Sequence, residues 1–205
     1  MPGLSLHTEA WVLRRLPPAE RFQQYQVFSA VHGPHLCLRR IASRAASATV
    51  ALDLFDEADL WLESASQGRT WFIKEARVLV HHGGIGRSYD ALRLASAFTG
   101  IIARNPAHED GWAGIGALLR QTLAAFGAAD RPDIVYFKAL YCFARDEGYP
   151  VKQEWAQGLG PADRAAIAGL LNRPLADQTE AAPAVARLTR RLEDYLRGYT
   201  EILLE

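Results

Sequence analysis

Apolar and polar residues alternate in short runs through the first eighty residues, as expected for β-strands with one buried face. Segment 23–31 shows the pattern best, because Tyr25 and Val27 fall on one face and Phe28 falls on the other. The predicted strands are 8–15, 23–31, 35–41, the pair 49–55 and 60–64 joined by an acidic connection, and 69–80. Roughly five short strands without an intervening helix predict a small antiparallel barrel, of which the OB-fold is the commonest five-stranded example.

The spacing of apolar residues changes at HHGGIGRS (81–88), where glycines end the last strand and Ser88 can cap a helix. Beyond it, apolar residues recur at helical spacing. The predicted helices are 89–104, 109–126, 132–147, a short one opened by Pro161, and about 183–203. We therefore predict an α+β chain with an N-terminal five-stranded OB-fold β-barrel over 1–82 and a C-terminal α-helical bundle domain over 87–205.

Charge is unevenly distributed along a chain that carries 23 basic and 23 acidic residues. The stretch 9–44 has two acids, Glu9 and Glu20, and a local surplus of four positive charges. Its six arginines are Arg14, Arg15, Arg21, Arg39, Arg40 and Arg44. Such a basic β-unit is typical of a surface that follows a phosphate backbone, although arginines also decorate ordinary soluble sheets.

These six arginines are our candidate DNA-binding residues, together with one aromatic ring. Tyr25 and Phe28 lie on opposite faces of their strand, so we expect that both cannot belong to the core. One of them would then line a groove, where an exposed ring can stack on a base.

Catalytic and metal-binding patterns are missing from the sequence. His81 and His82 are adjacent in a predicted strand and point to opposite faces, and no HExxH, CxxC or GxSxG motif occurs. The acids between Asp53 and Glu63 resemble a solvated hairpin. Cys37 and Cys142 lie in apolar segments and are expected to be buried thiols, not a disulfide. We therefore predict no enzyme activity, no metal and no cofactor.

No apolar run reaches the length of a membrane-spanning helix, and the first residues lack the pattern of a signal peptide. We expect no membrane association and a cytoplasmic location.

Several motifs, taken in order, resemble RecO, a family of bacterial recombination mediators and DNA-repair proteins. They are EAWVLRRLPPAER (9–21), VFSAVHG (27–33), LRRIASR (38–44), ALYCFARDEGYPV (139–151) and GLLNRPL (169–175). The resemblance implies an N-terminal OB-fold and a helical domain, binding of single- and double-stranded DNA without sequence preference, strand annealing and recombinase loading. It also implies association with the nucleoid. The implied partners are RecR and the acidic-hydrophobic C-terminal tail of single-stranded DNA-binding protein.

Two departures from the family pattern change the expectation. The region 152–164 has no cysteine where many members carry a four-cysteine zinc site, so we predict no zinc. The basic loop after the third strand has neither lysine nor glycine, which thins its positive charge. The alternative is a protein-interaction adaptor of the same fold that has lost DNA binding. Arginines gathered on one barrel face would favour DNA, and arginines paired with the acids 53–63 would favour the adaptor.

Overall fold

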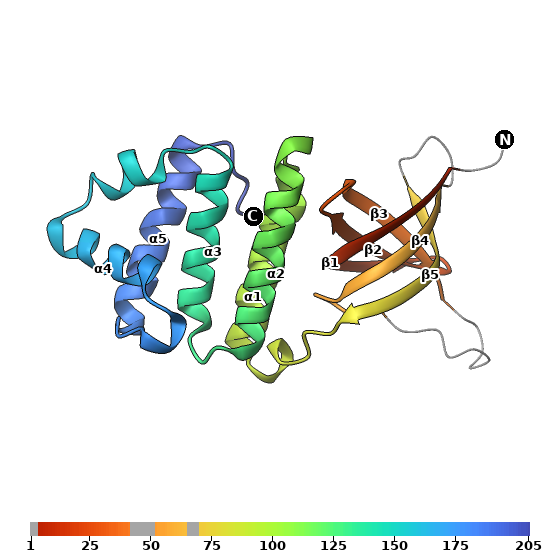
Figure 1. Cartoon of the computed structure of the whole chain (residues 1–205), viewed down its shortest axis with the longest axis horizontal. Coiled ribbons are helices and arrows are strands. Elements are labelled where there is room, and N and C mark those ends of the chain that lie inside the picture. Colours follow the sequence, from red (N-terminus) through yellow and green to blue (C-terminus); the bar gives the residue numbers. More distant parts are fainter. Residues whose placement is uncertain (1–3, 42–51, 65–69) are drawn as a thin grey trace. The chain divides into compact units, whose positions relative to one another are not determined.

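The computed structural model describes residues 4–41, 52–64 and 70–205 of the chain. Five strands come first and helices follow (Figure 1), which confirms the α+β class, the five-stranded N-terminal sheet and the helical C-terminal region. The chain divides into two compact units. Unit 1 comprises residues 1–82 and 106–117, and unit 2 comprises 83–105 and 118–205. The sequence pattern did not predict that residues 106–117 belong with the sheet.

Unit 1 contains one sheet whose strand order, β1-β2-β3-β5-β4, closes back on β1. The strands are β1 (Ser5–Ala19), β2 (Phe22–Ser29), β3 (Gly33–Arg40), β4 (Glu57–Ser64) and β5 (Trp71–Val80). Neighbouring strands are antiparallel except β3 and β5, which pair in parallel. Gly33 has φ +73°, the positive value that the predicted turn between β2 and β3 requires.

The inner face of this closed sheet holds the core of unit 1. Alternate residues of each strand point inward, and their side chains form one apolar cluster. Its members include Ala10, Val12, Tyr25, Val27, Cys37, Ala58, Leu60, Leu62, Trp71 and Ile73. Both cysteines are free thiols, as predicted; Cys37 is buried, whereas Cys142, which was also expected to be buried, is partly exposed. Burial raises the pKa of Cys37 to about 12.

β1 is longer than its predicted span of 8–15, because the chain runs on through Pro17-Pro18 to Ala19. Regular pairing with β2 is interrupted between Leu16 and Ala19. Both prolines therefore occupy a ladder irregularity, a position that tolerates the missing amide donor.

The predicted strand 49–55 is wrong over residues 52–55, which form a turn, and residues 49–51 lie outside the described part. β4 instead begins at Glu57 and includes the acidic segment that we expected to be a solvated hairpin. Asp56, Glu57 and Asp59 are buried, with 1%, 3% and 7% of their surface exposed. Basic side chains distant in sequence compensate Asp56 and Asp59, which no local pattern reveals.

Unit 2 is helical, and its first helix matches the prediction at both ends. Its elements are η1 (Ile85–Arg87), α1 (Tyr89–Arg104), the part of α2 (Trp112–Ala128) from Leu118 onward, α3 (Pro132–Asp146), η3 (Val151–Ala156), α4 (Pro161–Asn172), η4 (Leu175–Asp177) and α5 (Ala182–Tyr199). Ser88 Oγ accepts a hydrogen bond from Ala91 N at 3.3 Å, so the predicted N-cap is confirmed. α3 lies between α1 and α5 (Figure 1). None of the described helices is both long enough and apolar enough to cross a bilayer.

The short helix η2 (Glu109–Gly111) and the first turns of α2 belong to unit 1 and cover part of the outer face of its sheet. A Cβ atom on Gly116 would lie 2.6 Å from Ala30 Cβ and 3.2 Å from Trp11 Cζ3. The helix backbone therefore lies directly against β1 and the end of β2. This contact explains why Trp11 is 2% exposed although it points out of the sheet.

Candidate nucleic-acid interface

Four of the candidate arginines lie on the two strands that flank β2. Across β1 and β2, Arg14 pairs with Gln26 and Arg15 with Tyr25. Across β2 and β3, Arg39 pairs with Gln23 and Arg40 with Phe22. Arg21 is exposed in the turn that joins β1 to β2, and Arg44 lies outside the described residues. The structure thus brings five of the six arginines to one sector of unit 1.

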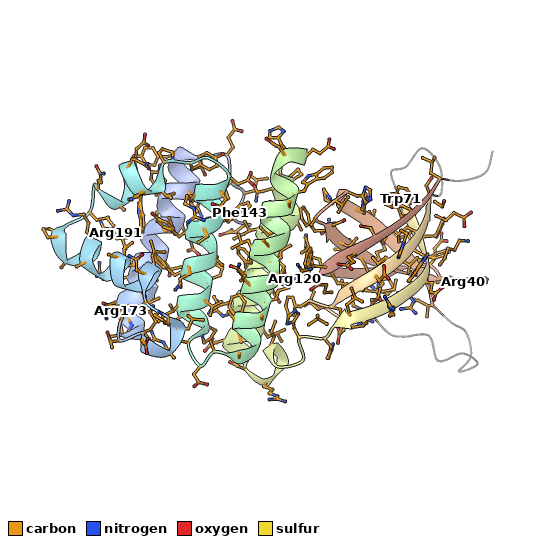
Figure 2. The ribbon with its side chains drawn as sticks, viewed as in Figure 1. Arg40, Trp71, Arg120, Phe143, Arg173 and Arg191 are labelled. Atoms are coloured by element: carbon orange, nitrogen blue, oxygen red, sulfur yellow. The ribbon has the colours of Figure 1, made fainter. Side chains whose placement is uncertain are left out.

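These arginines do not share one face of the sheet. Directly paired residues point to the same side, so Arg15 lies on the inner side with Tyr25, and Arg39 lies there with Gln23. Arg14 and Arg40 point to the outer side. Arg40 is exposed at the end of β3 (Figure 2), and Arg14 is half-buried. The outer side therefore carries one arginine on each side of β2.

Both aromatic candidates are buried, so the inference that only one could be core is wrong. Tyr25 is 4% exposed within the core cluster, and its hydroxyl donates to Leu52 O at 3.4 Å. Burial raises the pKa of Tyr25, and the charges of Arg15 and Arg39 oppose that rise. Phe28 is 1% exposed on the outer side, where it pairs with Trp11 beneath the start of α2. Neither ring presents a face for stacking.

A different pair of rings is accessible on the outer side. Phe22 of β2 and Phe72 of β5 are both half-buried, with ring centroids 5.5 Å apart and planes inclined at 50°. We call the surface that contains them the Phe22–Phe72 face. Its members are Phe22, Gln24, Gln26, Leu36, Leu38 and Phe72, with Arg14 and Arg40 at its borders. Sequence reasoning missed Phe72, because only the parallel pairing of β3 with β5 brings it there.

Asp56, Asp59 and Glu63 have partners other than these arginines. His81 Nδ1 donates to Asp56 Oδ1 at 2.7 Å, and His7 Nε2 to Asp59 Oδ1 at 2.6 Å. Asp59 also pairs with Arg77 at 3.2 Å, and Glu63 with Lys74 at 2.5 Å. Within residues 4–41, 52–64 and 70–205, the arginines without an ion pair include Arg14, Arg15, Arg21 and Arg40. Their charge is therefore available to a ligand.

Unit 2 has a basic pocket of its own, of about 570 Å³. Four cationic side chains line it, and no carboxylate is among its lining residues. The cations are Lys138, Arg145, Lys152 and Arg164, and the apolar lining includes Tyr141, Ile167 and Leu171. Lys152 comes from the π-helical turn η3, an irregular backbone form that is frequent at functional sites.

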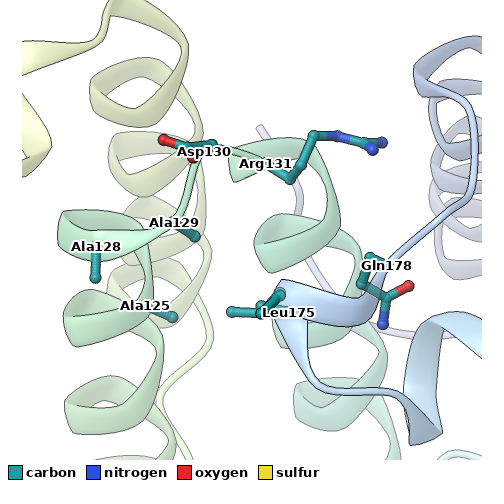
Figure 3. Close-up of a pocket in the computed structure, with 8 residues that line it drawn as sticks. Ala125, Ala128, Ala129, Asp130, Arg131, Leu175 and Gln178 are labelled. Atoms are coloured by element: carbon teal, nitrogen blue, oxygen red, sulfur yellow. The ribbon is translucent and has the colours of Figure 1, made fainter.

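A smaller pocket of about 420 Å³ lies between the end of α2 and η4 (Figure 3). Its lining is mostly alanine and leucine, and two of its polar side chains bond to nearby structure. Gln178 Nε2 donates to the carbonyls of Gly169, Leu170 and Arg173, which satisfies the end of α4. Arg131 pairs with Asp133 at 2.8 Å. This pocket contains no catalytic arrangement.

In the described part of the chain, no group of three or more His, Cys, Asp or Glu side chains could hold a metal ion. Comparison with known proteins gives no match among family models and none among curated proteins. The RecO resemblance therefore rests on the motifs alone.

Proposed function

We propose that this protein is a nucleic-acid-binding protein of recombinational DNA repair that resembles RecO. In this proposal, unit 1 is an OB-fold that binds single- and double-stranded DNA without sequence preference, and the chain promotes annealing and recombinase loading. The observation that carries the proposal is the set of exposed or half-buried arginines beside β2 whose neighbouring acids are paired with other side chains.

The strand order supports the OB-fold part of the proposal. OB-folds are five-stranded Greek-key barrels that bind oligonucleotides on the face of strands 2 and 3. Here the five strands close in the order β1-β2-β3-β5-β4, and Arg14 and Arg40 border the outer face of β2 and β3. Arg40 thus lies on β3, one of the strands that OB-folds use for nucleic acid, and Arg14 lies on β1, next to β2.

Salt dependence tests the proposal directly. Each phosphate contact to a single strand contributes about 0.7 to the slope of log K against log salt concentration. Fluorescence anisotropy with a labelled single-stranded oligonucleotide should therefore show weaker binding by Arg14→Ala/Arg40→Ala, with a slope flatter by about 1.4. Arg190→Ala is the matched control, because Arg190 is an exposed arginine of α5 and belongs to unit 2. No binding by the wild type at low salt would overturn the proposal.

The basic pocket of unit 2 favours a second candidate function, the protein-interaction adaptor. Its four cations and apolar lining are complementary to a peptide that has both acidic and apolar side chains. The acidic-hydrophobic tail of single-stranded DNA-binding protein has that chemistry, and the resemblance also names RecR as a partner. If the adaptor is correct, a labelled acidic-hydrophobic peptide should bind, Lys152→Glu should weaken it, and labelled DNA should not bind at all.

A further inference from the structure

We propose that the Phe22–Phe72 face stacks unpaired bases and makes single-stranded nucleic acid the preferred ligand of unit 1. This inference rests on the proposed function, because it assumes that the flanking arginines contact phosphates. It goes further by naming the residues that distinguish a single strand from a duplex.

The two rings lie where the fold has no structural need for them. The inner side of the sheet already contains the core, and the other outward-facing aromatic residue of β2, Phe28, is covered by the start of α2. Phe22 and Phe72 are instead half-buried, next to the half-buried side chains of Leu36 and Leu38. Aromatic rings that stay partly exposed on the outside of such a sheet can stack on bases.

Charge around the face fits a phosphate-bearing strand. Arg40 pairs with Phe22 and Arg14 with Gln26, four residues apart on β2. At about 3.4 Å per residue along a strand and 4.8 Å between strands, the two Cα atoms are separated by about 17 Å. The carboxylate adjoining Phe72 in the sheet is Glu63, and Lys74 neutralises it. A strand that crosses the face therefore meets Arg40 beside the two rings and Arg14 at the opposite border, with Gln24 and Gln26 of β2 between the two arginines.

Stacking on these rings discriminates between ligands because the bases of a duplex are already stacked and paired. Removing an aromatic ring that stacks on a base lowers affinity about 5- to 150-fold, whatever the base. The arginines contact phosphates, which both ligand forms have. The rings thus add affinity for single strands only.

The experiment replaces the rings and keeps their apolar volume, in the full chain with Phe22→Leu/Phe72→Leu. Affinity for a single-stranded oligonucleotide should fall at least 5-fold with an unchanged salt slope. Affinity for the matching duplex should stay the same, and so should affinity for an abasic strand, which retains phosphates but has no bases to stack. Phe22→Tyr/Phe72→Tyr, which keeps both rings, should bind like the wild type.

Three results would decide against the inference. Equal losses for single strand, duplex and abasic strand would indicate damage to the sheet. Unchanged single-strand binding by the leucine variant, with arginine variants still weaker, would remove the stacking role and leave the face for a protein partner. The proposed function would survive both results. Failure of the wild type to bind any oligonucleotide would overturn the two proposals together.

Discussion

Truncation of Phe28 tests whether the outer side of β2 is covered at Phe28 and open at Phe22. Phe22 and Phe28 are six residues apart on β2, so both side chains point out of the sheet. Phe28 is 1% exposed beneath the start of α2, whereas Phe22 is half-buried. The same substitution at both positions therefore compares a covered phenylalanine with a partly exposed one on the same side of the same strand.

We expect Phe28→Ala to lower the free energy of unfolding by about 3–5 kcal/mol, the usual cost when a closed site loses a phenyl ring and keeps a cavity. Phe22→Ala should cost about 1 kcal/mol, because a half-buried ring loses roughly half of the 1.5–3 kcal/mol of full burial and leaves no closed cavity. Urea unfolding followed by tryptophan fluorescence measures both, and unchanged m-values would confirm a common unfolded state. Equal losses would refute the inference that the start of α2 covers Phe28 and leaves Phe22 open.

The remaining predictions concern the helix contact and one histidine. Gly116→Val should destabilise unit 1 by about 1–3 kcal/mol in the same urea assay, since the new side chain would overlap Trp11 and Ala30. Gly114→Val is the control, because a Cβ there has open space and valine has a higher helix propensity than glycine, so this variant should not be destabilised. The hydrogen bond that His81 donates to Asp56 raises the pKa of His81, so the charged form stabilises the fold. The stability difference between wild type and His81→Ala should be fully present below the unfolded pKa of about 6.5 and should be lost as the pH rises through the higher folded value. Because His81 is largely exposed, the difference should stay below about 1 kcal/mol, and a difference that grew toward pH 9 would contradict the pairing.

The helices of unit 2 were predictable because their boundaries are marked by local chemistry. Ser88 supplies a cap, and Asn105-Pro106 cannot continue a helix, so α1 ends where the sequence indicates. Proline at the first turn of α3 and α4 is an equally local signal. None of these features depends on residues far away in the sequence.

The sheet was harder to predict where charged residues enter strands. The run of acids from Asp56 to Asp59 resembles a turn, yet β4 begins within it, because Asp56 is compensated by a histidine 25 residues away and Asp59 by one 52 residues away. The prediction that Tyr25 or Phe28 lines a groove was wrong for a related reason. Alternation correctly placed Tyr25 and Phe28 on opposite sides of β2, but the cover over Phe28 comes from a helix that begins at Trp112.

The neutral net charge of the chain is not an argument against a phosphate-binding surface, because three acids at or next to β4 are neutralised locally. Asp56, Asp59 and Glu63 each have a basic partner on β1, on β5 or just after β5. Surface potential depends on charges that remain uncompensated, and in unit 1 these include Arg14, Arg15, Arg21 and Arg40. Asp59→Asn should leave the salt slope of oligonucleotide binding unchanged, since Asp59 pairs with Glu9, five residues along β1 from Arg14. A steeper slope in that variant would mean that Asp59, or the Arg77 that it releases, acts on the bound strand.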